Sequence, residues 1–128
     1  MKESLAQRGQ ELLVTKSRLN LLFSTPVMNI TETYDLSNEQ YKHLTSQEDL
    51  YQTTGGTLYS KNCYMLENKI HYYFKKYIMT HVREFAYNIL KVNKNVEIYM
   101  TNSWVNYNDK NTTHIRHNHA NSFISGVF

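Results

Sequence analysis

The residues from Met65 to Leu90 carry the periodic pattern that most limits how this chain can fold. Apolar side chains recur there at intervals of three and four, at Leu66, Ile70, Phe74, Ile78, Val82, Phe85 and Ile89. Because an α-helix has about 3.6 residues per turn, this spacing predicts one long helix with a single apolar stripe. His71 and His81 fall off or beside the stripe, so we expect both to face solvent or to lie at the edge of the helix.

The stretch that follows this predicted helix changes to a period of two. The segment "KVNKNV", residues 91–96, ends the helix, and Asn93 or Asn95 is expected to adopt the left-handed backbone of a cap. In "VEIYMTNSWVNY", β-branched and aromatic residues alternate as in a strand, with Trp104 expected in the core. The segment "NDKN", residues 108–111, predicts a turn, and Thr113–His119 and Ser122–Phe128 are predicted as further strands. A helix followed by antiparallel strands predicts an α+β fold.

The part of the chain before the long helix is less regular. Residues 1–20 contain helix formers interrupted by a glycine, and the apolar run Leu19–Phe23 ahead of Pro26 is typical of a short strand. In "DLSNEQYKHLTSQEDLY", Ser37 is the expected N-cap of a short helix. The pair Gly55-Gly56 then predicts a turn before the long helix.

Length, charge and cysteine content exclude several classes of protein. With 128 residues, of which 41% are hydrophobic, the chain fits one compact domain. The net charge is +3, but Glu67 and Glu84 alternate with the basic residues of the predicted helix, which are Lys69, Lys75, Lys76 and Arg83. Such alternation is typical of a solvated helix face, so nucleic acid is not the expected partner. Cys63 is the only cysteine, which excludes an internal disulfide.

Nothing in the sequence predicts insertion into a membrane or export. No apolar run approaches the roughly 18 residues that a membrane-spanning helix needs. The N-terminus has basic residues but no continuous apolar stretch behind them, as a signal peptide would have. We therefore expect a cytoplasmic protein.

Three of the six histidines lie within six positions of one another, in "HIRHNH". Successive side chains of a strand point to opposite faces, so His117 and His119 are expected to project from the same side and could bind one metal ion. His114 is expected on the other face unless the chain bulges. Imidazole suits Fe, Zn, Cu or Ni, so the pair does not identify the metal. The alternative is a pair of surface histidines, and Asp109, the nearest acid, is interpreted as a turn residue.

The residues around this pair resemble the Fe(II)/2-oxoglutarate-dependent oxygenases, in particular a group that is widespread in phages and marine bacteria. Their pattern has a Ser-Trp-x-Asn strand, a short turn, His-x-His-x-Asn-Ser, two variable residues, and Ser-Gly-Val followed by aromatic residues. The chain matches it at Ser103, Trp104, Asn106, His117, His119, Asn121, Ser122, Ser125, Gly126, Val127 and Phe128. The resemblance extends more weakly back to Leu19, whereas residues 1–18 form an N-terminal extension outside it.

The resemblance implies a double-stranded β-helix, or jelly roll, that holds Fe(II) at its mouth. Such enzymes commonly bind iron through two His and one carboxylate, convert 2-oxoglutarate to succinate, and hydroxylate a C–H bond. It implies that His117 and His119 are iron ligands, although His119 stands where the common motif has a carboxylate. Asn106 and Ser122 are candidates for contacts with 2-oxoglutarate, with structural roles in the core or in a turn as the alternative.

A jelly roll takes about eight strands, but we identify only three after the predicted helix. The third iron ligand, and the Arg or Lys that would pair with the 2-oxoglutarate carboxylate, are expected beyond Phe128. Residues 19–128 are therefore expected to be the N-terminal part of an oxygenase-like domain, truncated or completed by a partner chain or a second copy.

Two other functions stay open at this point. A non-catalytic structural or interaction module encoded by a phage would have the beginning of a jelly roll without a working iron site. A cupin-like protein could use the same two histidines for another metal, although cupins usually have a Glu a few residues later, and none follows His119. The fold alone does not identify a substrate.

Overall fold

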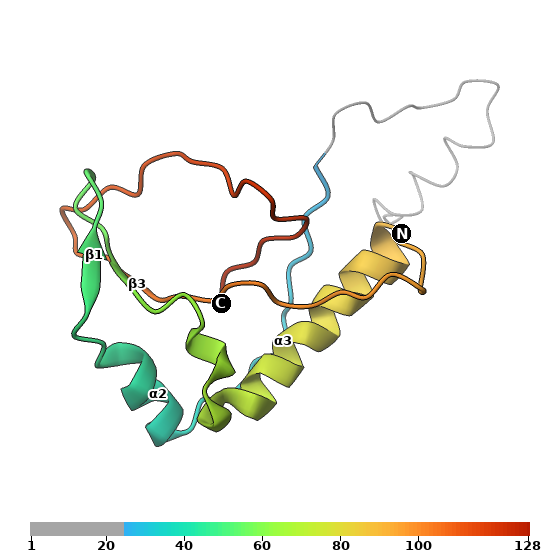
Figure 1. The fold of residues 1–128 in the computed structure, drawn as a ribbon, viewed down its shortest axis with the longest axis horizontal. Coiled ribbons are helices and arrows are strands. Elements are labelled where there is room, and N and C mark those ends of the chain that lie inside the picture. Colours follow the sequence, from blue (N-terminus) through green and yellow to red (C-terminus); the bar gives the residue numbers. More distant parts are fainter. Residues whose placement is uncertain (1–24) are drawn as a thin grey trace, which may run out of the picture.

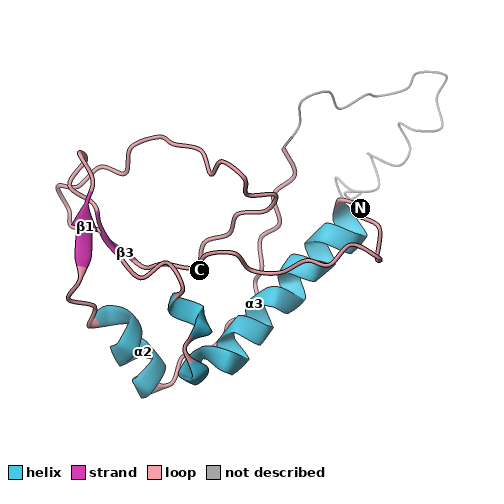
Figure 2. Cartoon of the chain, viewed as in Figure 1, coloured by secondary structure: helices cyan, strands magenta, loops and turns pink. Residues whose placement is uncertain are grey.

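The computed structural model describes residues 25–128, so the predicted N-terminal extension and the predicted strand Leu19–Phe23 lie outside the described residues (Figure 1). Within residues 25–128 the chain combines helices with a small three-stranded antiparallel sheet, which confirms the α+β class (Figure 2). No helix in this part of the chain is both long enough and apolar enough to cross a lipid bilayer.

Helix α2 (Asn38–Thr45) begins where the sequence predicts, directly after Ser37. The Ser37 hydroxyl accepts a hydrogen bond from the Gln40 amide at 3.2 Å, and Gln40 Oε1 accepts one from the Ser37 amide at 2.9 Å. This reciprocal capping box satisfies two backbone donors that the start of a helix otherwise leaves unpaired. Gln40 is buried, and its Nε2 also donates to the Ile70 carbonyl at 2.8 Å. The cap therefore joins α2 to the segment that precedes the long helix.

Strands β1 (Leu50–Gln52) and β2 (Leu58–Ser60) form an antiparallel hairpin, and β3 (Asn106–Tyr107) pairs with the other edge of β2. The hairpin turns at Gly56, whose φ of 87° lies in the left-handed region that glycine adopts without steric cost. The predicted turn at Gly55-Gly56 is confirmed. The predicted order of helix first and strands afterwards is wrong, because two of these three strands precede the long helix.

The long predicted helix is divided into four consecutive pieces. Two 3-10 turns, η1 (Met65–Glu67) and η2 (Lys69–His71), come first, and α3 (Tyr72–Glu84) follows them. A π-helical turn, η3 (Phe85–Ile89), ends the element. Apolar spacing predicts that a helical segment exists, but it does not distinguish these three hydrogen-bonding patterns from one another.

The first interruption of this helix has a local cause at Asn68. Its backbone is extended, with a ψ of 133°, which is incompatible with a continuous helix from η1 to η2. Its side chain then accepts a hydrogen bond from the Ile70 amide at 3.2 Å, which caps the new turn. The helix therefore restarts at Asn68 instead of running unbroken through it.

The end of the helix is formed by a different residue from the one predicted. The Leu90 amide donates to the Phe85 carbonyl at 2.9 Å, five residues back, and the left-handed residue that follows is Lys91, with a φ of 57°. The prediction that Asn93 or Asn95 would adopt this conformation is wrong. Instead, the side-chain oxygen of Asn93 accepts a hydrogen bond from the backbone amide of Asn95 at 2.9 Å, and this bond forms the next turn.

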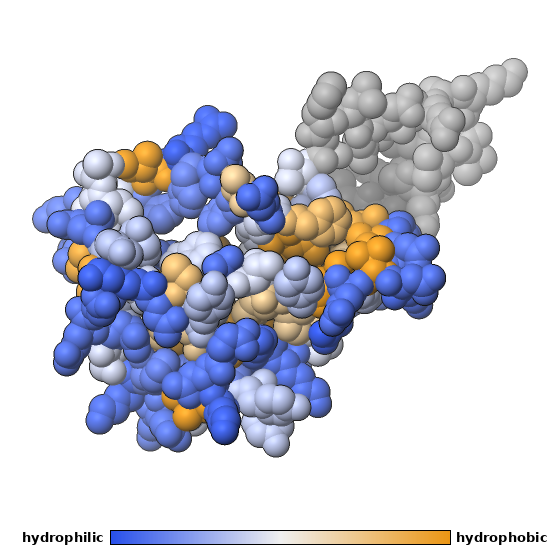
Figure 3. Space-filling model, in the orientation of Figure 1, coloured by the Kyte–Doolittle hydropathy of each residue, from blue (hydrophilic) through white to orange (hydrophobic). Residues whose placement is uncertain are grey.

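The apolar core of the described chain is small and lies against α3. Its buried apolar residues are Met65, Leu66, Phe74, Met79 and Ala86. The predicted stripe is therefore right for Leu66 and Phe74 but wrong at its end, where Ile89 is 55% exposed. On the visible face in Figure 3, hydrophobic residues gather around the C-terminal half of α3, while the area around α2 is mostly hydrophilic.

The two strands predicted after the turn at residues 108–111 are absent from the structure. Thr113 forms one isolated bridge with Gly56, but Thr113–His119 and Ser122–Phe128 contain no ladder (Figure 2). In the strand predicted over residues 96–107, only Asn106–Tyr107 is a strand. A strand needs a neighbouring strand to satisfy its backbone, and these stretches have none among residues 25–128. The turn itself is confirmed, since the Thr112 amide donates to the Asp109 carbonyl at 3.1 Å.

Two serine hydroxyls hold the segment before β3 against the rest of the chain. The Ser60 hydroxyl, which is fully buried, accepts from the Val105 amide at 3.1 Å and donates to the Asn62 carbonyl at 3.0 Å. The Ser103 hydroxyl accepts from the Leu66 amide at 2.9 Å. These side chains replace the backbone hydrogen bonds that a longer strand would form.

Replacing Ser60 by alanine should lower the free energy of unfolding by about 1–3 kcal/mol, because the part-buried Val105 amide loses its acceptor. Urea unfolding followed by circular dichroism measures the change. Ser125→Ala is the control, since Ser125 is exposed, and its effect should stay within about 0.5 kcal/mol. Equal effects of the two substitutions would contradict a structural role for the Ser60 hydroxyl.

Replacing Lys91 by glycine should raise the free energy of unfolding by up to about 1 kcal/mol, because glycine removes the steric cost of the left-handed backbone. Lys94→Gly is the matched control, since Lys94 has no positive φ and should gain nothing. The same unfolding measurement applies to both variants. Destabilisation by Lys91→Gly would show that the Lys91 side chain itself supports the helix end.

Candidate metal-binding site

Residues 114–127 form a loop that is attached to the rest of the molecule on both sides, at the orange-red end of the chain in Figure 1. Before the loop, the Thr113 amide donates to the Gly55 carbonyl at 2.9 Å. The backbones are so close that a Cβ on Gly55 would lie 1.9 Å from the Thr113 oxygen, so no other residue fits there. After the loop, the ring of Phe128 packs on Phe74 with their centroids 4.5 Å apart.

His117 and His119 lie next to each other on this loop. Their Nε2 atoms are 3.1 Å apart, and their ring centroids are 4.8 Å apart. The structure therefore brings the two predicted side chains together, although the backbone between them is not part of a sheet. Both residues are exposed, so a dissolved ion can reach them without any rearrangement of the core.

A hydrogen bond to the backbone orients the His117 ring. Its Nδ1 lies 2.9 Å from the Ile115 carbonyl oxygen. A carbonyl oxygen can only accept, so Nδ1 must be the donor, and a neutral ring then has its lone pair on Nε2. The lone pair that metal binding requires is therefore on the nitrogen that faces His119. Metal-binding histidines are commonly oriented in this way by a backbone carbonyl.

Trp104 supports the second ring of the pair. Its indole stacks on His119, with centroids 5.4 Å apart and an angle of 18° between the planes. Trp104 is 38% exposed, so the prediction that it lies in the core is wrong. The strand pattern indicated an aromatic residue on a buried face, whereas the segment has no neighbouring layer on that side and the ring packs on the histidine loop instead. Trp104 thus limits the rotation of the His119 ring.

His114 lies on the same side as the pair and not on the opposite face. Its ring meets the ring of His117 edge-on, with centroids 4.7 Å apart. The prediction of an opposite face assumed a regular strand, and the loop is not one. His114 packs against the pair, yet residues 25–128 contain no group of three or more His, Cys, Asp or Glu arranged to hold a metal ion.

The other predicted site residues form no side-chain hydrogen bond with the pair, although the Ser122 amide donates to the His119 carbonyl at 3.2 Å. Asn106 is an exposed residue of β3, paired with Tyr59 of β2. The Ser122 hydroxyl donates to the Ile124 carbonyl at 2.8 Å, which gives it a turn-closing role. The Asp109 carbonyl accepts from both the amide and the hydroxyl of Thr112, as its interpretation as a turn residue requires.

The distance between the two nitrogens fits a shared metal ion. Imidazole nitrogens lie about 2.1 Å from a first-row metal, so two nitrogens 3.1 Å apart can both reach one ion. The described residues supply these two ligands only, and further ligands would have to come from outside residues 25–128 or from solvent. The arrangement of the two rings is therefore compatible with two of the ligands of a metal ion.

A second imidazole pair joins α2 to the start of α3, and the sequence patterns did not indicate it. His71 Nε2 lies 3.0 Å from His43 Nδ1, and His43 Nε2 lies 3.2 Å from the Asn68 side-chain amide. His71 was expected to face solvent or to lie at the edge of the helix, and since it is fully buried it does not face solvent. The two histidines are 28 positions apart in the sequence, and only the packing of α2 on η2 brings them together.

The environment of His71 disfavours its charged form. Burial lowers the pKa of His71, and the neighbouring His43 ring lowers that pKa further. Its Nδ1 is buried and has no hydrogen-bond partner among residues 25–128. The folded chain therefore resists protonation at this ring, whereas an unfolded chain accepts the proton at the ordinary pKa of 6.5.

His81 lies at the edge of α3, where it was expected. It is half-buried, and its ring meets that of Tyr77 with centroids 4.7 Å apart. Carboxylate oxygens of Glu32 and Glu84 each lie 3.8 Å from one of its ring nitrogens. These distances exceed those of strong hydrogen bonds, so His81 contributes a weak surface interaction.

Stability should be greatest above pH 6.5 and should fall as the pH is lowered below that value, because protons then bind the unfolded chain in preference to buried His71. The His71→Gln variant should lose less stability than the wild type between about pH 7.5 and pH 5. Thermal unfolding at several pH values measures both profiles. His114→Gln is the control and should keep the wild-type profile, and a wild-type profile in His71→Gln would contradict the role of His71.

Comparison with models of known protein families, with curated proteins and with solved structures finds no match to this chain.

Proposed function

We propose that this chain supplies two imidazole ligands, His117 and His119, to the iron of an Fe(II)/2-oxoglutarate-dependent oxygenase. The observation that carries this proposal is the 3.1 Å separation of their Nε2 atoms, which lets both rings reach one metal ion. The surrounding sequence, with Ser-Trp-x-Asn before the pair and Ser-Gly-Val after it, supports iron over other metals through its resemblance to these oxygenases.

The neighbours of the pair would prepare it for metal binding. The Ile115 carbonyl holds His117 so that its Nε2 lone pair faces His119, and Trp104 holds the plane of His119. Fixing two ligands in advance reduces the entropy that is lost when the ion binds. The iron and 2-oxoglutarate would together supply the oxidation of a C–H bond, and the protein would supply binding and orientation.

The proposed enzyme requires more than residues 25–128. A third iron ligand and a basic residue for the 2-oxoglutarate carboxylate would come from a longer polypeptide, a partner chain or a second copy. The same additional strands would complete a jelly roll and cover the loop of residues 114–127. Asn106 and Ser122 stay candidates for contacts with the co-substrate in that complete enzyme, and both are exposed here.

The chain should bind one equivalent of Co²⁺ or Ni²⁺ at neutral pH, and the binding should quench the fluorescence of Trp104, its only tryptophan. His117→Ala and His119→Ala should each weaken binding by about tenfold or more, since each removes one of two protein ligands. Acidification should release the metal, because a protonated imidazole has no lone pair to donate. Calorimetric titration gives the affinities, and quenching of Trp104 shows that the metal binds near His119.

His114→Ala is the control for this experiment, because its ring packs on His117 but is not one of the two proposed ligands. Its affinity should stay within about twofold of the wild type. Metal binding that is unaffected by both His117→Ala and His119→Ala would exclude the pair as ligands and would favour the non-catalytic structural or interaction module. Succinate formation from 2-oxoglutarate, measured with Fe(II) in a polypeptide extended beyond Phe128, tests the oxygenase activity itself.

A further inference from the structure

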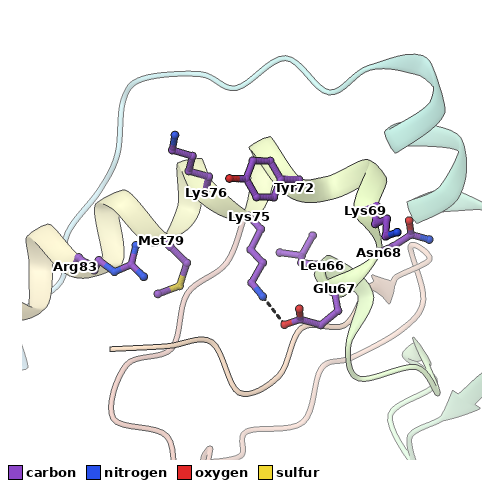
Figure 4. A pocket seen from close by; sticks show the side chains of 9 residues that line it. All are labelled: Leu66, Glu67, Asn68, Lys69, Tyr72, Lys75, Lys76, Met79 and Arg83. Carbon is purple, nitrogen blue, oxygen red and sulfur yellow. Dashed lines mark hydrogen bonds and ion pairs between the residues drawn. The ribbon is translucent and has the colours of Figure 1, made fainter. Parts of the chain in front are cut away.

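A groove beside α3 has four basic side chains among the nine that line it, and its volume is about 690 Å³ (Figure 4). Its residues, 66 to 83, are far in the sequence from the histidine loop, and none of them is proposed as part of the metal site. The residues that line it are Leu66, Glu67, Asn68, Lys69, Tyr72, Lys75, Lys76, Met79 and Arg83. Pockets for small ligands commonly have volumes of a few hundred to about 1,000 Å³, so the groove is of that size.

The charge of the groove is positive and only partly neutralised. Of the described residues that line it, Glu67 is the single acidic one, and it pairs with Lys75. Lys69, Lys76 and Arg83 form no ion pair with any carboxylate of residues 25–128. Three positive charges along the lining, with no carboxylate partner among residues 25–128, attract anions and favour a ligand with more than one negative charge.

The helix repeat explains why the charges and apolar atoms share one wall. Lys75, Met79 and Arg83 are spaced four residues apart, so they lie along the same side of α3, and Lys75 points towards Glu67 (Figure 4). Tyr72 and Lys76 lie along the neighbouring edge of the same helix (Figure 4). Met79 and Leu66 are buried residues of the core whose side chains reach this wall.

Each part of the groove matches a different part of one kind of ligand. The guanidinium of Arg83 can donate two parallel hydrogen bonds to a phosphate or carboxylate, and lysine ammonium groups add point charges. The ring of Tyr72, which is exposed, can cover a flat or apolar organic group, together with the small exposed parts of Met79 and Leu66. A ligand with a compact multiple negative charge at one end and an organic body at the other satisfies both.

We propose that this groove binds a small organic polyphosphate of nucleotide size. The phosphates would lie on Lys76 and Arg83, with the organic part against Met79. A polymeric nucleic acid fits less well, because the basic wall is confined to about the length of α3, which is roughly 20 Å for its 13 residues. The groove is independent of the proposed iron site, and either can be wrong without the other.

The test uses ATP without Mg²⁺, inorganic tripolyphosphate and adenosine as probes in calorimetric titrations at low salt. ATP should bind more tightly than tripolyphosphate, and adenosine most weakly, because both parts of the groove contribute. The double variant Lys76→Gln/Arg83→Gln should bind ATP about tenfold or more weakly. The charge-matched control, Lys94→Gln/Lys110→Gln, removes two exposed lysines outside the groove and should stay within about twofold.

Three results would overturn the assignment. An equal loss of ATP affinity in both double variants would mean that net charge, and not the groove, attracts the anion. Equal affinities for ATP and tripolyphosphate would exclude an organic body in the groove. If a single-stranded oligonucleotide of ten nucleotides bound much more tightly than ATP, nucleic acid would be favoured as the ligand. Lys76 and Arg83 are exposed, so unchanged circular dichroism and melting temperature are expected for both variants.

Discussion

The ring of Phe74 receives aromatic contacts from three parts of the chain that are far apart in the sequence. Tyr34 lies 5.0 Å from it, Phe128 4.5 Å and His71 6.4 Å, measured between ring centroids. Because residues 25–128 bury few apolar side chains, this one cluster holds the segment before α2, the helix and the C-terminal loop together. The imidazole pair of His43 and His71 extends the cluster to α2. Polar and aromatic contacts therefore help to hold the elements together, as a larger apolar core does in other proteins.

How far the fold could be predicted depended on whether each signal was local. Ser37 and Gln40 are three positions apart, and their side chains specify the start of α2 by themselves. The turn at Gly55-Gly56 is equally local. The strands of residues 113–128 were predicted from alternation alone, but alternation provides no partner strand, and the structure contains none for them among residues 25–128. The 3-10 and π-helical turns also have no distinct periodic signature.

The candidate site also combines local features, which the sequence predicts, with long-range contacts, which it does not. The neighbouring positions of His117 and His119 follow from a spacing of two, and the structure places them side by side even without a regular strand. The packing of Trp104 on His119 and of His114 on His117 depends on how the loop folds back, which no spacing rule describes. The buried His43–His71 contact spans 28 positions and could be recognised only once α2 was placed against η2.

The attachment of residues 114–127 at both sides has a consequence for any partner that approaches the histidines. A segment fixed at Gly55 and at Phe74 samples far fewer shapes than a free tail of the same length, and the difference grows only slowly with the number of residues between the anchors. Insertions into this span would therefore be inexpensive in entropy. Loosening either anchor would instead free the part of the span next to it, while the stacking of Trp104 on His119 would still hold the middle. The geometry of the imidazoles therefore depends on two distant contacts as well as on their own neighbours.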